Sequence, residues 1–485
     1  MLLQYALIAF GFLLLLYVIT QQGYRAVYAY VIAWMVYPHW GRYLFGIRTI
    51  PLSFFLEQAM MAVLWVKILR HSSDYTAPGI HREVGLQKLF WVTVIVQYTL
   101  GMWVVNAILP LSNADASITR LLGFGHTIAA LTFFQACSKF IKSKEQIISF
   151  FRIYFYAAIV LAVELLATLF VPPVNSALSP YTIKSGVGGG FFSIFLNDYL
   201  SVQLVCATGV LTALYFWYST RRVGYIFGGG VAALPIFFNT ERSAILGLIL
   251  GIVFFLAHRI EKKKIYLIMI GTGLVIALIA VNPKSMIKTR DSFLGKLAGY
   301  FSDESRRRQI TNIFSDASIH ARIGIQIRGI ELALKVMPFG VGEDMCRYYM
   351  SLPVENLWKF GPSTHPETLS NYDRVSSGEK MTEVHNGYLD CLLSFGVLGL
   401  VALVAGLRNV WLNWKTTDRI SKGKSLGLLR DAIFAMGLVL LSYHLFTTNP
   451  KIYVIIFVLL HASFLLSANR STFDEQQSSG HALVR

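Results

Sequence analysis

A histidine stands where a long apolar run begins, in the segment from Val384 to Leu400. His385 precedes the first turn of the helix that this run predicts, and the positive end of a helix dipole disfavours the charged imidazolium form. A neutral imidazole accepts protons well near neutral pH. His385 is therefore a candidate general base, and the alternative is a boundary histidine that contacts lipid headgroups.

The second candidate is Arg242, in a short turn between two apolar runs that reads Phe-Asn-Thr-Glu-Arg-Ser-Ala over residues 238–244. An ionisable side chain at membrane depth costs free energy and usually has a functional role. Arg242 either binds an anion at this turn, or it extends to the headgroups or pairs with its neighbour Glu241.

The third candidate lies in an amphipathic segment near residues 319–337, whose apolar residues recur at helical spacing. The residues of that apolar stripe are Ile319, Ile323, Ile327, Ile330, Leu334 and Met337. On the same helical wheel, Arg322 projects over a face of small residues such as Gly329, and this face can accept a ligand. Arg328 falls on the solvated side. The alternative for both arginines is the surface of an interfacial helix, which Pro338 would end.

Two guanidinium groups and one imidazole at one side of a membrane suit a diphosphate substrate. Arginine binds phosphate through a planar fork and does not lose its proton. A neighbouring histidine can remove the proton from a hydroxyl group. The three candidates therefore fit glycosyl transfer from a lipid diphosphate, in which an acceptor hydroxyl attacks the anomeric carbon and the lipid diphosphate leaves.

The sequence indicates neither a metal site nor a nucleotide site. Gly423-Lys424-Ser425 resembles the end of a P-loop, but Asp418 stands where that motif needs a glycine. Patterns typical of zinc proteases, EF-hands and metal-dependent sugar-nucleotide transferases are missing, and the four cysteines show no CxxC spacing. We expect no metal and no cofactor.

The elements that position these residues must lie in a membrane. Of the 485 residues, 55% are hydrophobic and 14% are charged, whereas about 25% are charged in an ordinary soluble domain. A soluble chain of this length could not bury so much apolar surface. The net charge of +17 then reflects Lys and Arg in cytoplasmic loops, and we expect no nucleic-acid partner.

Thirteen apolar runs follow one another along the chain. They predict an all-α polytopic membrane protein with about 12–14 transmembrane helices, of which ten lie in residues 1–281 and the others in residues 386–470. Lys and Arg number 22 after odd-numbered runs and 6 in the short segments after even-numbered runs. The positive-inside rule then makes residues 282–385 a long, largely helical periplasmic loop and residues 471–485 a disordered cytoplasmic tail.

The ordered set of motifs resembles the O-antigen polymerase and O-antigen ligase superfamily. His385-Asn386, followed by nine residues and Gly396, matches the His-Asn-x9-Gly signature of that superfamily. The arginine-bearing turn and the arginine-bearing helix precede it in the family's order, and the helix ends in Pro-Phe-Gly-x-Gly at residues 338–342. The resemblance is dense over residues 238–410.

The resemblance implies an inverting, metal-independent transferase whose donor is an undecaprenyl-diphosphate-linked oligosaccharide. It implies that His385 is the general base and that Arg242 and Arg322 stabilise the departing diphosphate. Asn386 would orient His385 or an acceptor hydroxyl. The family often has another arginine before an earlier Gly-Phe pair, where this chain offers Lys184. The substrate-binding candidates are Asn386, Tyr388, Arg328 and Lys184.

Polymerase and ligase share this donor and differ in the acceptor. A polymerase uses the terminal sugar hydroxyl of a second lipid-linked repeat unit, and a ligase uses lipid A–core. The His-Asn-Gly-Tyr-Leu form of the signature resembles O-antigen and exopolysaccharide polymerases, so we favour polymerase. The long loop also offers aromatic side chains on which sugars could stack. These are Tyr348, Tyr349, Trp358 and Tyr372.

A polysaccharide exporter or flippase is an alternative from another class, because Glu164 and Asp198 lie in apolar runs as a transport site requires. A polymerase or a ligase would lie in the bacterial inner membrane as a multi-pass protein whose active site faces the periplasm. Its partners would be the lipid-linked oligosaccharide, membrane lipid and, for a polymerase, a chain-length regulator protein.

Overall fold

A computed structural model gives the structure of the chain. It describes residues 2–36, 52–71, 78–111, 114–171, 199–238, 242–257, 316–352, 360–362, 364–379, 382–421, 425–444 and 454–467. Several predicted features lie outside these ranges, among them the apolar run 265–281, the first part of the long loop, and the tail 471–485.

The described residues form helices and contain no strand. The first helices are α1 (Leu2–Thr20), α2 (Tyr24–Val36), α3 (Leu52–Arg70), α4 (Pro78–Val96), the π-helical turn η2 (Gln97–Gly101), α5 (Met102–Ile108), α6 (Ala114–Phe140), α7 (Lys144–Phe170), α9 (Tyr199–Thr220), α10 (Gly224–Phe238) and α11 (Arg242–Ala257). Then follow α15 (Asp316–Val336), α16 (Cys346–Tyr349), α17 (Pro366–Ser376), α18 (Gly387–Ser421), α19 (Ser425–His444) and an apolar helix at Val454–Ser467.

Six of these helices are long and apolar enough to cross a membrane. They are Arg82–Ile108, Ala116–Phe140, Lys144–Ala167, Val202–Thr220, Gly387–Lys415 and Leu426–His444. Four shorter apolar helices accompany them. Helices prevail because lipid offers no hydrogen-bond partners to an open strand. The all-α polytopic membrane fold is confirmed, while the number of 12–14 spans stays a prediction.

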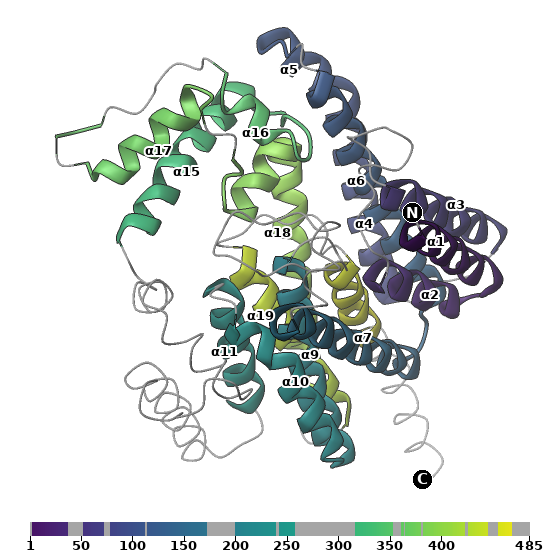
Figure 1. The fold of residues 1–485 in the computed structure, drawn as a ribbon. Coiled ribbons are helices and arrows are strands. Elements are labelled where there is room, and N and C mark those ends of the chain that lie inside the picture. Colours follow the sequence, from purple (N-terminus) through teal and green to yellow (C-terminus); the bar gives the residue numbers. More distant parts are fainter. Residues whose placement is uncertain are drawn as a thin grey trace, which may run out of the picture.

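The helices of the long loop lie together at one end of the molecule. Figure 1 shows α15, α16 and α17 in green beside the beginning of α18, with α9, α10, α11 and α19 further along toward the other end. α15 packs against α17 and against α18. The predicted amphipathic helix is therefore present, and α18 links it to the membrane-spanning bundle.

The buried apolar side chains form two clusters. The larger one fills the bundle of apolar helices. The smaller one joins the loop to that bundle, because Leu332 and Val336 of α15 share it with Val105 of α5 and Leu393 of α18. The loop helices are thus fixed by apolar packing to the end of the bundle at which α18 begins.

Candidate active site

His385 lies directly before α18, and the polar group of its neighbour caps that helix. The Asn386 Oδ1 atom accepts hydrogen bonds from the backbone N–H groups of Tyr388 and Leu389, both at 3.1 Å. This is the N-cap arrangement that asparagine favours. The side chain of Asn386 thus fixes the start of the helix directly after His385. Its role in orienting His385 or an acceptor hydroxyl stays a prediction.

The backbone of His385 is held in the left-handed region, with φ at 51°. Few residues other than glycine adopt this conformation, because the side chain then crowds the backbone. The half-buried imidazole places Nε2 3.4 Å from the Thr382 Oγ1 atom. Strained residues of this kind are concentrated at functional sites.

Gly396, the last residue of the signature, breaks α18. Its φ of 67° and ψ of −160° interrupt the helix. The freed carbonyls of Leu393 and Ser394 accept hydrogen bonds from the N–H groups of Val341 (2.6 Å) and Gly342 (3.1 Å). Gly396 thus allows the Pro-Phe-Gly-x-Gly segment to bond to the backbone of α18.

Gln97 also binds the Pro-Phe-Gly-x-Gly segment. Its Oε1 atom accepts a hydrogen bond from the N–H of Gly340 at 2.8 Å, and its Nε2 group donates to the Gly340 carbonyl. Gln97 is buried in the π-helical turn η2. π-Helical turns are frequent at functional sites. Sequence reasoning missed this residue, because one glutamine in an apolar run carries no local signal.

α15, which carries Arg322, contacts the start of α18. The helix approaches through Gly329, where an added Cβ atom would lie 2.7 Å from Val384 Cγ1 and 3.2 Å from Leu389 Cδ2. Val384 directly precedes His385, and Leu389 lies in the first turn of α18. Arg322 precedes Gly329 by two helical turns and therefore lies on the same side of α15. Arg322 is half-buried, and the described residues include no hydrogen-bond or ion-pair partner for it.

The face of α15 that packs on the protein differs from the predicted one. Its small residues do not leave a ligand surface open, because Gly329 contacts α18 and Gly324 contacts α17 at the Thr368 carbonyl. The apolar stripe faces outward instead: Ile323, Ile330, Leu334 and Met337 are 38%, 44%, 51% and 41% exposed. This correction has a simple cause, because an apolar stripe in a membrane protein can face lipid as well as a core.

The prediction that Arg328 is solvated is wrong. Arg328 is 1% exposed. Its Nε group donates to the Met350 carbonyl at 3.0 Å, and its guanidinium also donates to the Leu352 carbonyl (2.5 Å) and to Glu331 Oε2 (3.2 Å). Tyr372 of α17 donates to the same carboxylate at 2.7 Å. Arg328 therefore ties α15 to the following loop, and its observed contacts give it a structural role.

We expect Arg328→Met to lower the free energy of unfolding by about 3–5 kcal/mol, because it removes the cation beside the buried Glu331 carboxylate. The double variant Arg328→Met, Glu331→Gln should recover part of this loss. The midpoint of thermal unfolding in detergent measures both changes. An Arg328→Met variant as stable as the wild type would contradict the structural role.

Arg242 begins α11, and its side chain lies outside the described residues. The register of the helix still places its backbone. An added Cβ at Gly247 would lie 3.0 Å from the Val439 carbonyl, and one at Gly251 would lie 3.1 Å from the Ala435 carbonyl. α11 and α19 are thus antiparallel, and continuing the register brings Arg242 level with His444, the last residue of α19.

His444 in turn contacts the start of α18. An added Cβ at Gly387 would lie 2.5 Å from its Nδ1 atom, and its ring meets the Tyr388 ring edge-on with centroids 6.5 Å apart. The Tyr388 hydroxyl donates to the Leu441 carbonyl at 3.3 Å. The backbones of Arg242 and Arg322 therefore lie at the same end of the bundle as His385. Lys184 lies outside the described residues.

Two of the four candidate stacking residues do not present a surface to a sugar. Tyr349 and Tyr372 are buried. Tyr348 is half-buried, with its hydroxyl 3.1 Å from Thr119 Oγ1, and Trp358 lies outside the described residues. Aromatic side chains in the loop segment thus mostly build its own core, which sequence alone cannot distinguish from a binding platform.

Carboxyl groups gather near the first turn of α18, and the sequence analysis did not include them. Burial, together with the charge of Asp344, raises the pKa of Glu343 to about 8. The Glu343 carboxyl accepts a hydrogen bond from Thr127 of α6. Burial also raises the pKa of the Cys346 thiol well above its ordinary value, and the nearby carboxylates of Asp390 and Glu383 raise it further. These carboxyl groups therefore form an acidic cluster near the first turn of α18.

The raised pKa of Glu343 predicts a pH-dependent stability. A group whose pKa is higher in the folded state stabilises the fold below its ordinary pKa of 4.5 and loses this contribution as the pH rises to about 8. We expect the unfolding midpoint of Glu343→Gln, relative to wild type, to rise across this window. Glu379→Gln removes an exposed carboxylate and serves as the control. Parallel midpoints for Glu343→Gln and wild type would contradict the prediction.

Residues 227–404 match the family model described as O-antigen ligase. None of the curated proteins matches the chain. The matched range includes the turn that carries Arg242, helix α15 and the His-Asn signature, and the family implies a glycosyltransferase-like membrane enzyme. The match confirms the predicted resemblance to the O-antigen polymerase and O-antigen ligase superfamily over residues 227–404.

Proposed function

We propose that the chain is a polysaccharide polymerase of the bacterial inner membrane. It transfers a glycan from an undecaprenyl-diphosphate donor to the terminal sugar hydroxyl of a second lipid-linked repeat unit on the periplasmic side. His385 is the general base, and Arg242 and Arg322 stabilise the departing diphosphate. A chain-length regulator protein is the further partner that this function implies.

One observation carries the proposal. The arginine-bearing helix α15 contacts, through Gly329, Val384 directly before His385 and Leu389 in the first turn of α18. A glycine at that contact allows the backbones to approach closely. A diphosphate bound near the imidazole would extend toward Arg322, two turns before Gly329 on the same side of α15, and the α11–α19 register supports the role of Arg242, because it brings this residue level with His444 beside the start of α18.

The proposed reaction is a single displacement. The neutral imidazole of His385 takes the proton of the acceptor hydroxyl, and the oxygen attacks the anomeric carbon from the face opposite the diphosphate. The bond between the anomeric carbon and the diphosphate oxygen breaks, and its electrons stay on the leaving diphosphate. Fixed guanidinium groups stabilise the charge that develops there. The anomeric configuration inverts, because one displacement occurs.

Reconstitution in vesicles tests the proposal. The purified chain receives lipid-linked repeat units without added metal, and the products are separated by length. Longer lipid-linked chains support a polymerase. Transfer to added lipid A–core alone supports a ligase, the second candidate, which the description of the matched family favours. If the repeat units stay unchanged both when incubated alone and when lipid A–core is added, both functions are contradicted.

Substitutions of Arg322 test whether its guanidinium stabilises the departing diphosphate. We expect Arg322→Ala to lower the turnover number by roughly 10²–10³-fold, the usual loss when one preorganised stabilising donor is removed. Arg322→Lys should retain part of the activity, because a lysine keeps the charge but not the planar fork. Product formation at saturating donor measures both. Lys335→Ala, on an exposed position of the same helix, is the matched control.

A further inference from the structure

An apolar cavity lies inside the bundle below the candidate active site. It has a volume of about 170 Å³ and lies between α18, α19, α4 and the helix Val454–Ser467. Its wall is formed by aliphatic and aromatic side chains such as Leu403, Leu407 and Leu438. An apolar cavity of about 150 Å³ stays dry and binds hydrocarbon ligands. This cavity is therefore a site for hydrocarbon and not for water.

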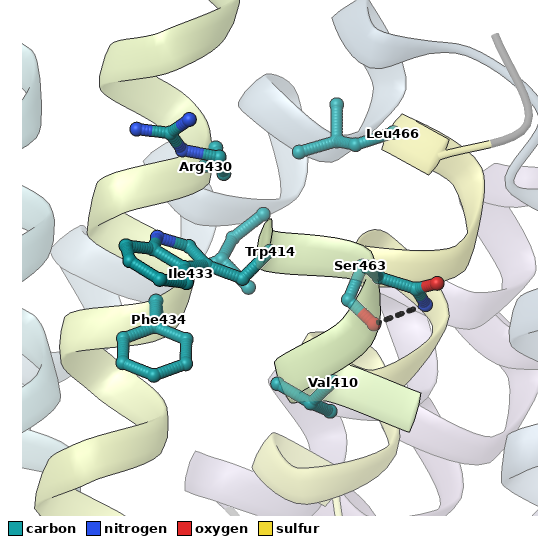
Figure 2. Close-up of a pocket in the computed structure, with 8 residues that line it drawn as sticks. Val410, Trp414, Arg430, Ile433, Phe434, Ser463 and Leu466 are labelled. Carbon is teal, nitrogen blue, oxygen red and sulfur yellow. Dashed lines mark hydrogen bonds between the residues drawn. The ribbon is translucent and has the colours of Figure 1, made fainter. Parts of the chain in front are cut away.

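The two ends of the cavity differ. Tyr388 and His444, which meet beside His385, line one end. At the other end the lining residues Ile433 and Phe434 border an aromatic cluster, shown in Figure 2, in which the Trp414 and Phe434 rings lie 4.8 Å apart. From Ile433 to His444 the wall on α19 extends about 17 Å. The cavity is elongated along the bundle and begins at the candidate active site.

The cavity also has access to the membrane. Trp411 lines it and is itself 50% exposed. Two glycines leave the space open: an added Cβ at Gly437 would meet no atom within 4 Å, and one at Gly406 would meet only Leu86, at 3.9 Å. Larger side chains at these positions would fill the cavity. Hydrocarbon can thus enter from the bilayer, and the glycines keep room for it.

We propose that this cavity binds the polyprenyl chain of the lipid-diphosphate donor, with the diphosphate held near His385 and the chain passing Tyr388 into the bundle. The inference rests on the proposed function for the identity of the donor. The location of the cavity favours this chain over a phospholipid acyl chain, because its polar end adjoins the residues proposed to hold a diphosphate. Burial of the chain would fix the donor before the chemical step.

Binding of two lipids that share a headgroup tests the inference without requiring catalysis. The full chain in detergent is titrated with radiolabelled undecaprenyl diphosphate and, separately, with isopentenyl diphosphate, whose single isoprene unit is too short to reach Gly437. Gly437→Leu should weaken binding of the long-chain lipid roughly tenfold, which corresponds to about 1.4 kcal/mol of lost apolar contact, and should leave binding of isopentenyl diphosphate unchanged. Gly406→Ile fills the cavity from the other helix. Gly230→Leu, an exposed helical glycine with no atom within 4 Å of its Cβ position, is the control.

The outcomes separate the proposed polyprenyl site from the proposed glycan transfer. A selective loss of long-chain binding in both cavity variants supports the inference even if no glycan transfer is found. Equal binding by all variants overturns it, as does an equal loss for both lipids, which would place the effect at the headgroup. A phospholipid that copurifies with the wild type and is lost from Gly437→Leu would also overturn it, because an acyl chain would then be the occupant. Glycan transfer by the wild type is assayed separately.

Discussion

Replacing His385 with alanine should lower the rate of glycan transfer roughly 10²–10⁴-fold, the usual contribution of a positioned general base. The effect should appear in the turnover number, because the imidazole acts on the acceptor hydroxyl in the transition state and adds little to donor binding. Vesicles that contain the purified variant and lipid-linked repeat units provide the measurement. Product length and initial rate are compared with the wild type at equal protein.

A second substitution separates the imidazole from its backbone conformation. The φ of 51° at His385 is tolerated by asparagine more readily than by most residues. His385→Asn should therefore fold as the wild type does and lose as much activity as His385→Ala. His385→Gly should be at least as stable as the wild type and equally inactive, because glycine adopts this φ without strain. A His385→Asn variant with near wild-type turnover would contradict the assignment of the base.

Replacing Gly396 with alanine should detach the Pro-Phe-Gly-x-Gly segment from α18. An added Cβ would lie 2.2 Å from the Pro338 carbonyl oxygen and 2.8 Å from Phe339 Cα, and both are backbone atoms. The φ and ψ of Gly396 also lie in a region that is essentially restricted to glycine. We expect a loss of about 3 kcal/mol or more in unfolding free energy and an inactive protein. The midpoint of thermal unfolding and the rate of proteolysis after Pro338 measure these effects.

Gly230→Ala provides the comparison for this prediction. Gly230 is also a glycine in an apolar helix, but its Cβ position has no atom within 4 Å and its φ is not in the left-handed region. Alanine is favoured over glycine inside a helix by about 1 kcal/mol, so this variant should be as stable as the wild type or slightly more so. If both variants unfold at the same temperature, the backbone contact between the segment and α18 does not stabilise the protein as argued.

The elements that carry the candidate site could be predicted from sequence, because their signals are local. Lipid leaves an apolar run little choice but a helix, and the period of the 319–337 segment gave α15 with bounds close to the observed Asp316–Val336. The order of the motifs also indicated the superfamily, which the match over residues 227–404 confirms. The residues at helix boundaries, such as Asn386, follow from capping chemistry.

The contacts between these elements could not be predicted, because they depend on which face of each helix meets its neighbour. An apolar stripe shows that α15 is amphipathic, but it does not tell whether protein or lipid covers the stripe. The buried side is instead built from Gly324, Gly329 and the Arg328–Glu331 pair. The bonds of Gln97 to Gly340 span 243 positions of the chain, and no local pattern encodes such a pairing.

The smaller apolar cluster has a practical consequence for anyone who wishes to study the long loop before α18 by itself. Its interior is completed by Val105 and Leu109 beside α5, and by Leu393 within α18. A truncated protein that starts at Asp316 and stops at His385 would lack these walls and would expose Leu332 and Val336 to water in addition to the outward stripe of α15. Such a fragment is not an autonomous folding unit, and expression trials should retain the flanking hydrophobic helices.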